Sequence, residues 1–144
     1  MSRLRPGFTV ERLNRDAENC LPGHLGVDML TLEQGRASGR LLIRPQHLAP
    51  NGRLHAASLI ALADTMTGHA TMSHLPEGAV SFATIELKSN HLGTLTEGEL
   101  HCVATAQHLG RTTQVWDAVV SDAASGRQLV LYRCTQMVLW PAGN

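Results

Sequence analysis

The sequence predicts an α+β domain in which a curved antiparallel sheet wraps around one long buried helix. Residues 55–75 are the only long helical candidate, and they are apolar on nearly all sides, as in helices of a protein interior. Two strands are expected before this helix and four after it, with short turns between them. Strands joined by short turns pair antiparallel, and a sheet that must cover one helix has to curl around it.

The segments ahead of the long helix carry shorter patterns. Apolar residues recur at helical spacing over residues 8–20, which predicts a short amphipathic helix, and Pro22-Gly23 is expected to end it. Alternation with period two over residues 36–44 predicts a strand, joined to the preceding one by a turn at Gln34-Gly35. Residues 45–54 contain two prolines and are expected to form a loop.

Beyond the long helix, which Pro76-Glu77-Gly78 should end, the pattern changes to period two and keeps it. The six expected strands are residues 25–34, 36–44, 80–92, 99–109, 112–122 and 128–139. The order is helix, two strands, buried helix, four strands, which is the layout of the hotdog fold.

The composition excludes several classes of protein. Twelve basic and twelve acidic residues leave no net charge, and only five residues are Phe, Trp or Tyr, so a nucleic-acid-binding surface is not expected. No apolar run approaches the ~20 residues of a membrane helix. The basic start of the chain lacks the apolar stretch of a secretory signal. We therefore expect a single domain over residues 1–144 that binds neither nucleic acid nor membrane.

Cysteine and histidine spacing indicates neither disulfides nor a metal site. Cys20, Cys102 and Cys134 are far apart and form no CxxC pair, so we expect free thiols in a reducing cytoplasm. The histidines lack metal-ligand spacing with an acid or a cysteine, and we expect no metal and no other cofactor.

Asp64 is the strongest catalytic candidate. It is the only acid between Glu33 and Glu77, and it lies in the middle of the most apolar helix. Asp is a poor helix-interior residue, and a carboxylate buried without partners costs several kcal/mol. A functional role is one explanation. The alternative is a structural role, in which Asp64 faces a solvent-filled recess or is hydrogen-bonded to a hydroxyl such as that of Thr65 or Thr67.

The start of the long helix is a candidate oxyanion site. The first backbone N–H groups of a helix have no internal acceptor, and the helix dipole makes this end electropositive. A carbonyl oxygen that gains negative charge would be stabilised there. Asp64 lies nine residues beyond His55, or roughly 13 Å along the axis. One chain therefore cannot bring both to one carbon atom, and a second chain or another strand must contribute.

Five short motifs occur in the order found in PaaI-type and 4-hydroxybenzoyl-CoA-type hotdog thioesterases, which this chain resembles. In this sequence they are Gly52, Leu54-His55, Leu62-Ala63-Asp64-Thr65, Thr84-Ile85-Glu86-Leu87 and Gly110-Arg111. Residues 89–93 and 107–122 are most similar to the 1,4-dihydroxy-2-naphthoyl-CoA hydrolase branch. The resemblance covers residues 25–139, most of the chain.

The resemblance implies a role for each matching residue. Asp64 would be the catalytic acid, as nucleophile or as general base for water. The backbone N–H of Ala56, with Ala57 as a second donor, would hold the thioester oxygen, and Thr84 of a neighbouring subunit would help to position the water. The remaining residues implied in catalysis are His55 and Asn51. Those implied in binding substrate and coenzyme A are Ala57, Thr67, Gly68, Asn90, His91 and Arg111.

Two positions depart from the family pattern. The family's His-Gly-Gly is His-Ala-Ala here, and the added Cβ atoms would crowd a thioester at that turn. The family's Asn or Gln three residues before Gly52 is Ala49, with Asn51 beside the glycine instead.

These observations favour an acyl-CoA thioesterase that acts on an aryl- or medium-chain acyl-CoA. The alternative is a non-catalytic hotdog module that binds an acyl group or a partner, which the two departures favour. A hydratase of the same fold would need an Asp/His pair at a different spacing. We expect a homodimer or homotetramer with active sites at the subunit interface.

Overall fold

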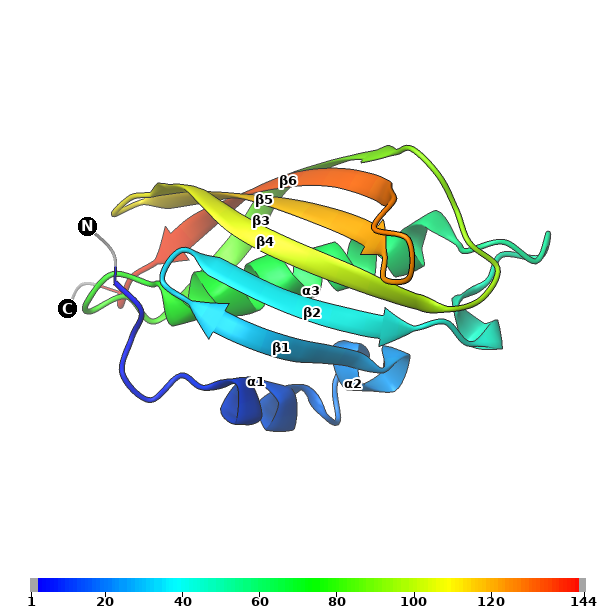
Figure 1. The fold of residues 1–144 in the computed structure, drawn as a ribbon. Helices are drawn as coiled ribbons and strands as arrows, with labels where there is room; N and C mark the ends of the chain where they lie inside the picture. Colours follow the sequence, from blue (N-terminus) through cyan, green and yellow to red (C-terminus); the bar gives the residue numbers. More distant parts are fainter. Residues whose placement is uncertain (1–2, 143–144) are drawn as a thin grey trace.

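The computed structural model describes residues 3–142, and its centre is the 18-residue helix α3, Ala56–Ser73. Figure 1 shows α3 lying against one face of a curved sheet whose strands run along it. The strands are β1 Val27–Glu33, β2 Arg36–Leu42, β3 Ser81–His91, β4 Glu99–Leu109, β5 Thr113–Asp122 and β6 Gln128–Leu139. Their order is β1-β2-β4-β5-β6-β3, and all neighbours pair antiparallel. The predicted hotdog layout is confirmed.

The N-terminal segment differs from the prediction. Helix α1, Val10–Ala17, ends three residues earlier than expected, and a second helix α2, Leu21–Leu25, contains the Pro22-Gly23 pair that was expected to end the first. Proline is compatible with the first turn of a helix, where its missing N–H would have no acceptor. The chain leaves α2 at Gly26, whose φ of 78° favours glycine. The expected loop 45–54 also contains a short 3₁₀ helix, Pro45–His47.

The core lies between α3 and the sheet. Leu62, Ala63, Met66 and Ala70 of α3 are completely buried. The sheet contributes the buried Leu41, Leu100, Cys102, Trp116 and Val120 to the same cluster. The face of α3 that the sheet does not cover is the one available for a site. No helix in the described part of the chain is both long and apolar enough to cross a lipid bilayer.

Hydrogen bonds hold both ends of α3 to neighbouring segments of the chain, and a buried histidine takes part at each end. Before the helix, Leu54 N–H donates to the Leu95 carbonyl, and Ser58 Oγ donates to the carbonyl of the buried His47. After the helix, His74 Nε2 accepts from Gly35 N–H, so its Nδ1 carries the proton that bonds Ala70 O. These contacts fix the position of α3 along the sheet.

The two edge strands of the sheet are treated differently. Edge strand β1 is covered by α1 and α2 (Figure 1). Edge strand β3 is eleven residues long and mostly exposed. Large apolar side chains remain exposed on or beside it: Val80, Ile85, Leu87 and Leu92. The unpaired backbone groups of a long, exposed, apolar edge strand can pair with a strand of another chain.

Gly39 of β2 allows α3 to approach the sheet closely. A Cβ at this position would overlap the Met66 side chain of α3 and would lie 2.7 Å from the Asp28 carbonyl oxygen of β1. Backbone and core atoms cannot both move aside in a packed interior. The glycine is therefore needed for packing.

Gly39→Ala should lower the free energy of unfolding by about 1–3 kcal/mol, because the added methyl overpacks the contact with Met66. Gly68→Ala is the matched control. It should raise stability by up to about 1 kcal/mol, because alanine is the better helix former and the nearest atom to its Cβ, Phe82 Cζ, is 3.4 Å away. Urea unfolding measures both, and equal effects of the two substitutions would contradict the packing argument.

Candidate active site

A cavity of about 790 Å³ lies on the face of α3 that the sheet leaves open. Asp64, Thr65, Gly68, His69 and Met72 line it from α3. They form two adjacent rows on one face, because residues four apart on a helix lie one above the other: Asp64, Gly68 and Met72 in one row, Thr65 and His69 in the next. Residues 5–22 supply the opposite wall, and Val80 and Phe82 supply a third side. The cavity is therefore bounded by α3, the N-terminal helices and the start of β3.

The Asp64 carboxylate is held by one strong hydrogen bond. Tyr132 of β6 donates its hydroxyl to Asp64 Oδ1 at 2.7 Å. Burial, and then the bond to Asp64, raises the pKa of Tyr132 far above its ordinary value, so the hydroxyl remains a donor. No hydrogen bond to Asp64 Oδ2 is present within residues 3–142. One carboxylate oxygen is thus fixed, and the other is available to a reactant.

Thr67 lies behind this pair and not in the cavity. Its side chain is completely buried, and its hydroxyl bonds the carbonyl oxygens of Ala63 and Asp64. It also adjoins the Tyr132 hydroxyl. The structure therefore gives Thr67 a place beside the donor that holds Asp64, whereas Gly68 lines the cavity as the sequence suggested.

The predicted oxyanion residues gather at the start of α3. His55 is the N-cap, and its Nδ1 accepts from Ala57 N–H at 3.0 Å. Within the described chain, no acceptor is recorded for Ala56 N–H, which leaves that donor available. Asn51 Oδ1 accepts from Arg53 N–H, so this amide oxygen is used within its own turn. The two alanines sit in helical backbone and are exposed, so they do not disturb the helix start.

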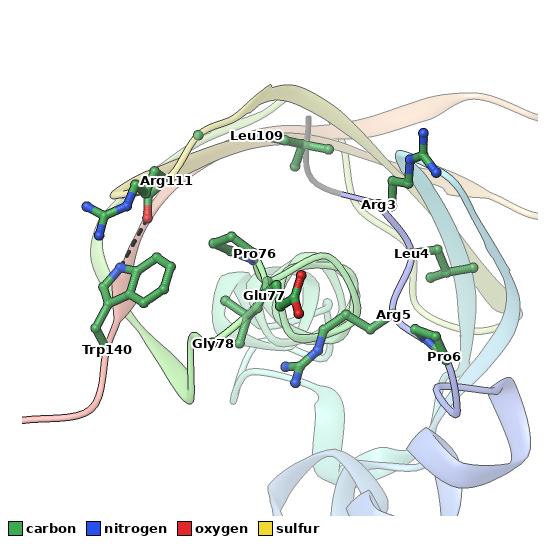
Figure 2. A pocket seen from close by; sticks show the side chains of 12 residues that line it. Arg3, Leu4, Arg5, Pro6, Pro76, Glu77, Gly78, Leu109, Arg111 and Trp140 are labelled. Carbon is green, nitrogen blue, oxygen red and sulfur yellow. Dashed lines mark hydrogen bonds between the residues drawn. The ribbon is translucent and has the colours of Figure 1, made fainter.

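The remaining predicted residues lie elsewhere. Thr84, Asn90 and His91 are exposed on β3, and His91 Nε2 lies 3.0 Å from Ser89 Oγ. Arg111 lies in the β4–β5 turn with its guanidinium over the Trp140 ring, and it lines a different cavity, of about 800 Å³, beyond the C-terminal end of α3. Figure 2 shows this second cavity with Arg111 and Trp140 on one side and Arg3 and Arg5 on the other. One chain thus distributes the predicted residues over four places.

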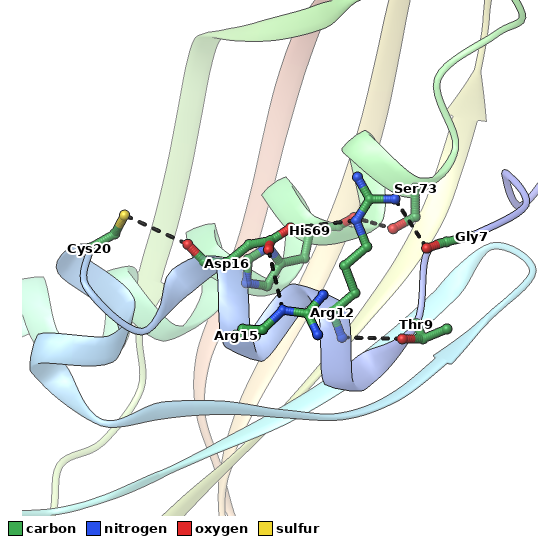
Figure 3. A network of polar contacts seen from close by, with 8 residues as sticks. All are labelled: Gly7, Thr9, Arg12, Arg15, Asp16, Cys20, His69 and Ser73. Carbon is green, nitrogen blue, oxygen red and sulfur yellow. Dashed lines mark hydrogen bonds and ion pairs between the residues drawn. The ribbon is translucent and has the colours of Figure 1, made fainter.

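Two features of the site were missed at the level of sequence. Tyr132 is 68 residues from Asp64 along the chain, and no local pattern links them. The α1 wall was also missed: Figure 3 shows Asp16 of α1 in a network with Arg12 and Arg15, facing His69 of α3. Tyr132 is one of only five aromatic residues in the sequence, which marks it as a residue of interest, but the sequence does not indicate that Asp64 is its partner.

The thiols and histidines form no competing centre. Cys102 and Cys134 are buried, and burial raises the pKa of the Cys102 thiol to about 12, so it stays protonated and unreactive at neutral pH. Cys20 is exposed and free. Among the described residues, no three His, Cys, Asp or Glu side chains gather as a metal site would require.

The amino-acid sequence is similar to those of known proteins. The family model of the thioesterase superfamily matches residues 51–127, which include α3 and Asp64. The proofreading thioesterase EntH of Klebsiella pneumoniae is 31% identical over 132 residues, covering 92% of this chain and 95% of that protein. A 1,4-dihydroxy-2-naphthoyl-CoA hydrolase of Listeria monocytogenes is 27% identical over 77% of this chain and 89% of its own.

Solved structures agree with the sequence comparisons. A thioesterase of Haemophilus influenzae has a TM-score of 0.90 at 26% identity and covers 100% of this chain and 99% of that one. A mutant thioesterase of Pseudomonas aeruginosa has a TM-score of 0.88 at 28% identity, over 94% of this chain and 97% of that one. The match to the Haemophilus influenzae thioesterase spans the whole chain, so it includes the N-terminal wall of the cavity as well as the segment that the family model covers.

Proposed function

Because the chain belongs to the thioesterase superfamily and is a thioester hydrolase, we propose that it hydrolyses an aryl- or medium-chain acyl-CoA and that Asp64 carries out the reaction. The observation that supports this most directly is the Asp64 carboxylate, oriented by Tyr132 and facing a cavity. The similarity to a 1,4-dihydroxy-2-naphthoyl-CoA hydrolase supports an aryl-CoA substrate.

Asp64 acts on the thioester carbonyl through its free oxygen. Either Oδ2 attacks the carbonyl carbon as nucleophile, or it takes a proton from a water that attacks. In the first route the C–S bond breaks to give an anhydride between Asp64 and the acyl group, and water then cleaves this anhydride to release the acid. In the second route water adds to the carbonyl carbon and the C–S bond breaks directly. In both routes the thiolate of coenzyme A leaves and takes up the proton that the water gives up. Tyr132 holds the carboxylate so that one lone pair faces the cavity. The negative charge on the carbonyl oxygen is met by a helix N-terminus, through the free N–H of Ala56.

That N–H comes from a second chain. The start of α3 lies beside the loop that follows β3, because Leu54 N–H donates to the carbonyl of Leu95, four residues after β3 ends. A two-fold axis that pairs β3 with β3 of another copy makes the two strands run in opposite directions. It brings His55 and Ala56 of one chain toward the cavity of the other, and it places Thr84 beside the shared edge. We propose a homodimer of this kind, or a homotetramer that contains it.

The acyl group enters the cavity beside Asp64. Its apolar lining residues are Phe8, Leu13, Ala17, Leu21, Met72, Val80 and Phe82. A space of about 790 Å³ suits an aromatic or medium-length acyl group. Asn90, His91 and Arg111 remain the proposed contacts for the pantetheine arm and phosphates of coenzyme A. An acyl-CoA substrate and three free thiols suit the cytoplasmic location that we propose.

Asp64→Asn should reduce kcat on an acyl-CoA substrate by about 10²–10⁴-fold, because the amide neither attacks nor accepts a proton. The measurement is steady-state thiol release over a panel of CoA esters. Asp28→Asn, the same change on the exposed surface of β1, should leave turnover unaltered. Equal turnover by wild type and Asp64→Asn would eliminate Asp64 from the mechanism.

Tyr132→Phe should reduce kcat by about tenfold or more while KM changes little, because a single hydrogen bond to the carboxylate orients it. Steady-state kinetics with the best ester of the panel provides both constants. Circular dichroism should show the wild-type fold, since only a hydroxyl is removed. A variant as active as wild type would show that the hydrogen bond does not position Asp64.

Ile85→Lys should dissociate the assembly and lower activity together, because it places a charge on the paired β3 edge. Light scattering after gel filtration should yield a multiple of the 15.6 kDa chain mass for wild type and 15.6 kDa for the variant. Leu42→Lys, on an exposed β2 position, is the control for added charge. A wild-type protein that runs at the single-chain mass while active would contradict the shared site.

A further inference from the structure

The cavity beside Asp64 has a polar end that the hydrolysis does not use. His69 lies five residues after Asp64 on α3, about 7.5 Å further along the helix axis, and its side chain lines the same cavity. Between them Thr65 and Gly68 line the cavity, and Gly68 has no side chain to obstruct the path. Met72, the next residue of α3 that lines the cavity after His69, is apolar. A group that starts at Asp64 therefore meets His69 after the length of about one aromatic ring.

His69 is a half-buried imidazole that remains able to bond a ligand. Its backbone carbonyl accepts from Ser73 Oγ, but within residues 3–142 no hydrogen bond to either ring nitrogen is recorded. Burial lowers the pKa of His69, and the nearby charge of Asp16 opposes this only in part. The ring is therefore neutral at pH 7, with one nitrogen that donates and one that accepts.

The groups that face His69 from α1 are already engaged with one another. Arg12 Nε lies 3.5 Å from Asp16 Oδ2, and Arg15 Nε lies 4.0 Å from Asp16 Oδ1 (Figure 3). Arg12 is anchored in turn by the Phe8 ring, 4.4 Å from its guanidinium carbon, and by the Gly7 carbonyl. The thiol of Cys20 bonds the Asp16 carbonyl. The residues of this wall are held in place by one another, and the imidazole of His69 is left to bond a ligand at this end of the cavity.

On the basis of the proposed function, we propose that His69 determines substrate specificity by hydrogen-bonding a hydroxyl group on the acyl moiety, about one ring length from the thioester carbonyl. A polar group enclosed without a partner costs free energy, and a hydroxyl on the substrate would satisfy it. An otherwise identical acyl group without the hydroxyl leaves the imidazole unpaired. The apolar walls then bind the ring, and His69 selects among rings by their polar substituent.

The test compares two aroyl-CoA esters that differ only by a hydroxyl at the far end of the ring. Wild type should favour the hydroxylated ester in kcat/KM by about tenfold or more. His69→Leu should abolish this preference, mainly by slowing the hydroxylated ester. His69→Gln, which keeps a donor and an acceptor, should retain part of it. Met72→Leu alters the same wall without a hydrogen-bonding group, so the ratio of the two kcat/KM values should stay as in wild type.

Exposed His24 of α2 provides the control for histidine loss, and His24→Leu should leave both rates unchanged. Binding of the two free acids, measured by calorimetry, tests the same contact without turnover: wild type should bind the hydroxylated acid more tightly, and His69→Leu should bind both alike. Lack of preference in wild type, or a preference that survives in His69→Leu, would overturn the proposal. Failure to hydrolyse any CoA ester would overturn the proposed function alone, because the affinities of the acids would still decide the role of His69.

Discussion

The burial of α3 in a curved sheet is the constraint on which the other features of this protein depend. The sheet covers most of the helix surface, and residues such as Leu62, Met66 and Ala70 have no exposed area. Apolar packing of this kind positions the helix tightly, and Gly39 shows how close the contact is. What remains open is one face of α3, and that face carries Asp64, Gly68 and His69. The core thus decides which helix residues can act as a site.

The same packing explains how Asp64 is oriented within an apolar helix. The carboxylate stands at the boundary between core and cavity, so it keeps contact with solvent on one side. On the other side Tyr132 reaches across from β6 with a hydroxyl that burial keeps protonated. The other proposed site residues lie away from Asp64 in one chain, at the α3 N-terminus, on β3 and in the β4–β5 turn. Pairing of exposed β3 edges is a physical route to bring them together.

The elements with strong periodicity were predictable and those with local exceptions were not. The four strands after α3 and the hairpin before it agree with the structure within a few residues, because alternation over many positions leaves one face for the core. The prediction that Pro22-Gly23 ends a helix was wrong. Proline interrupts the interior of a helix, but it is compatible with the first turn, and here Pro22 lies in the first turn of α2. Asp64 was detectable as an acid in an apolar helix. The position of Thr67 was not, because one residue of difference turns a side chain by about 100° around a helix.

By itself, the amino-acid sequence determined the fold class, the catalytic candidate and the family resemblance, because periodicity and short motifs are local properties of the chain. Only the tertiary structure decided what surrounds Asp64: Tyr132 as its donor, the N-terminal helices as the opposite wall and His69 as the polar end of the cavity. These partners come from segments far apart in sequence, so no local pattern links them. They meet because the sheet must bury α3, and burial brings distant side chains together without leaving a signal in either segment.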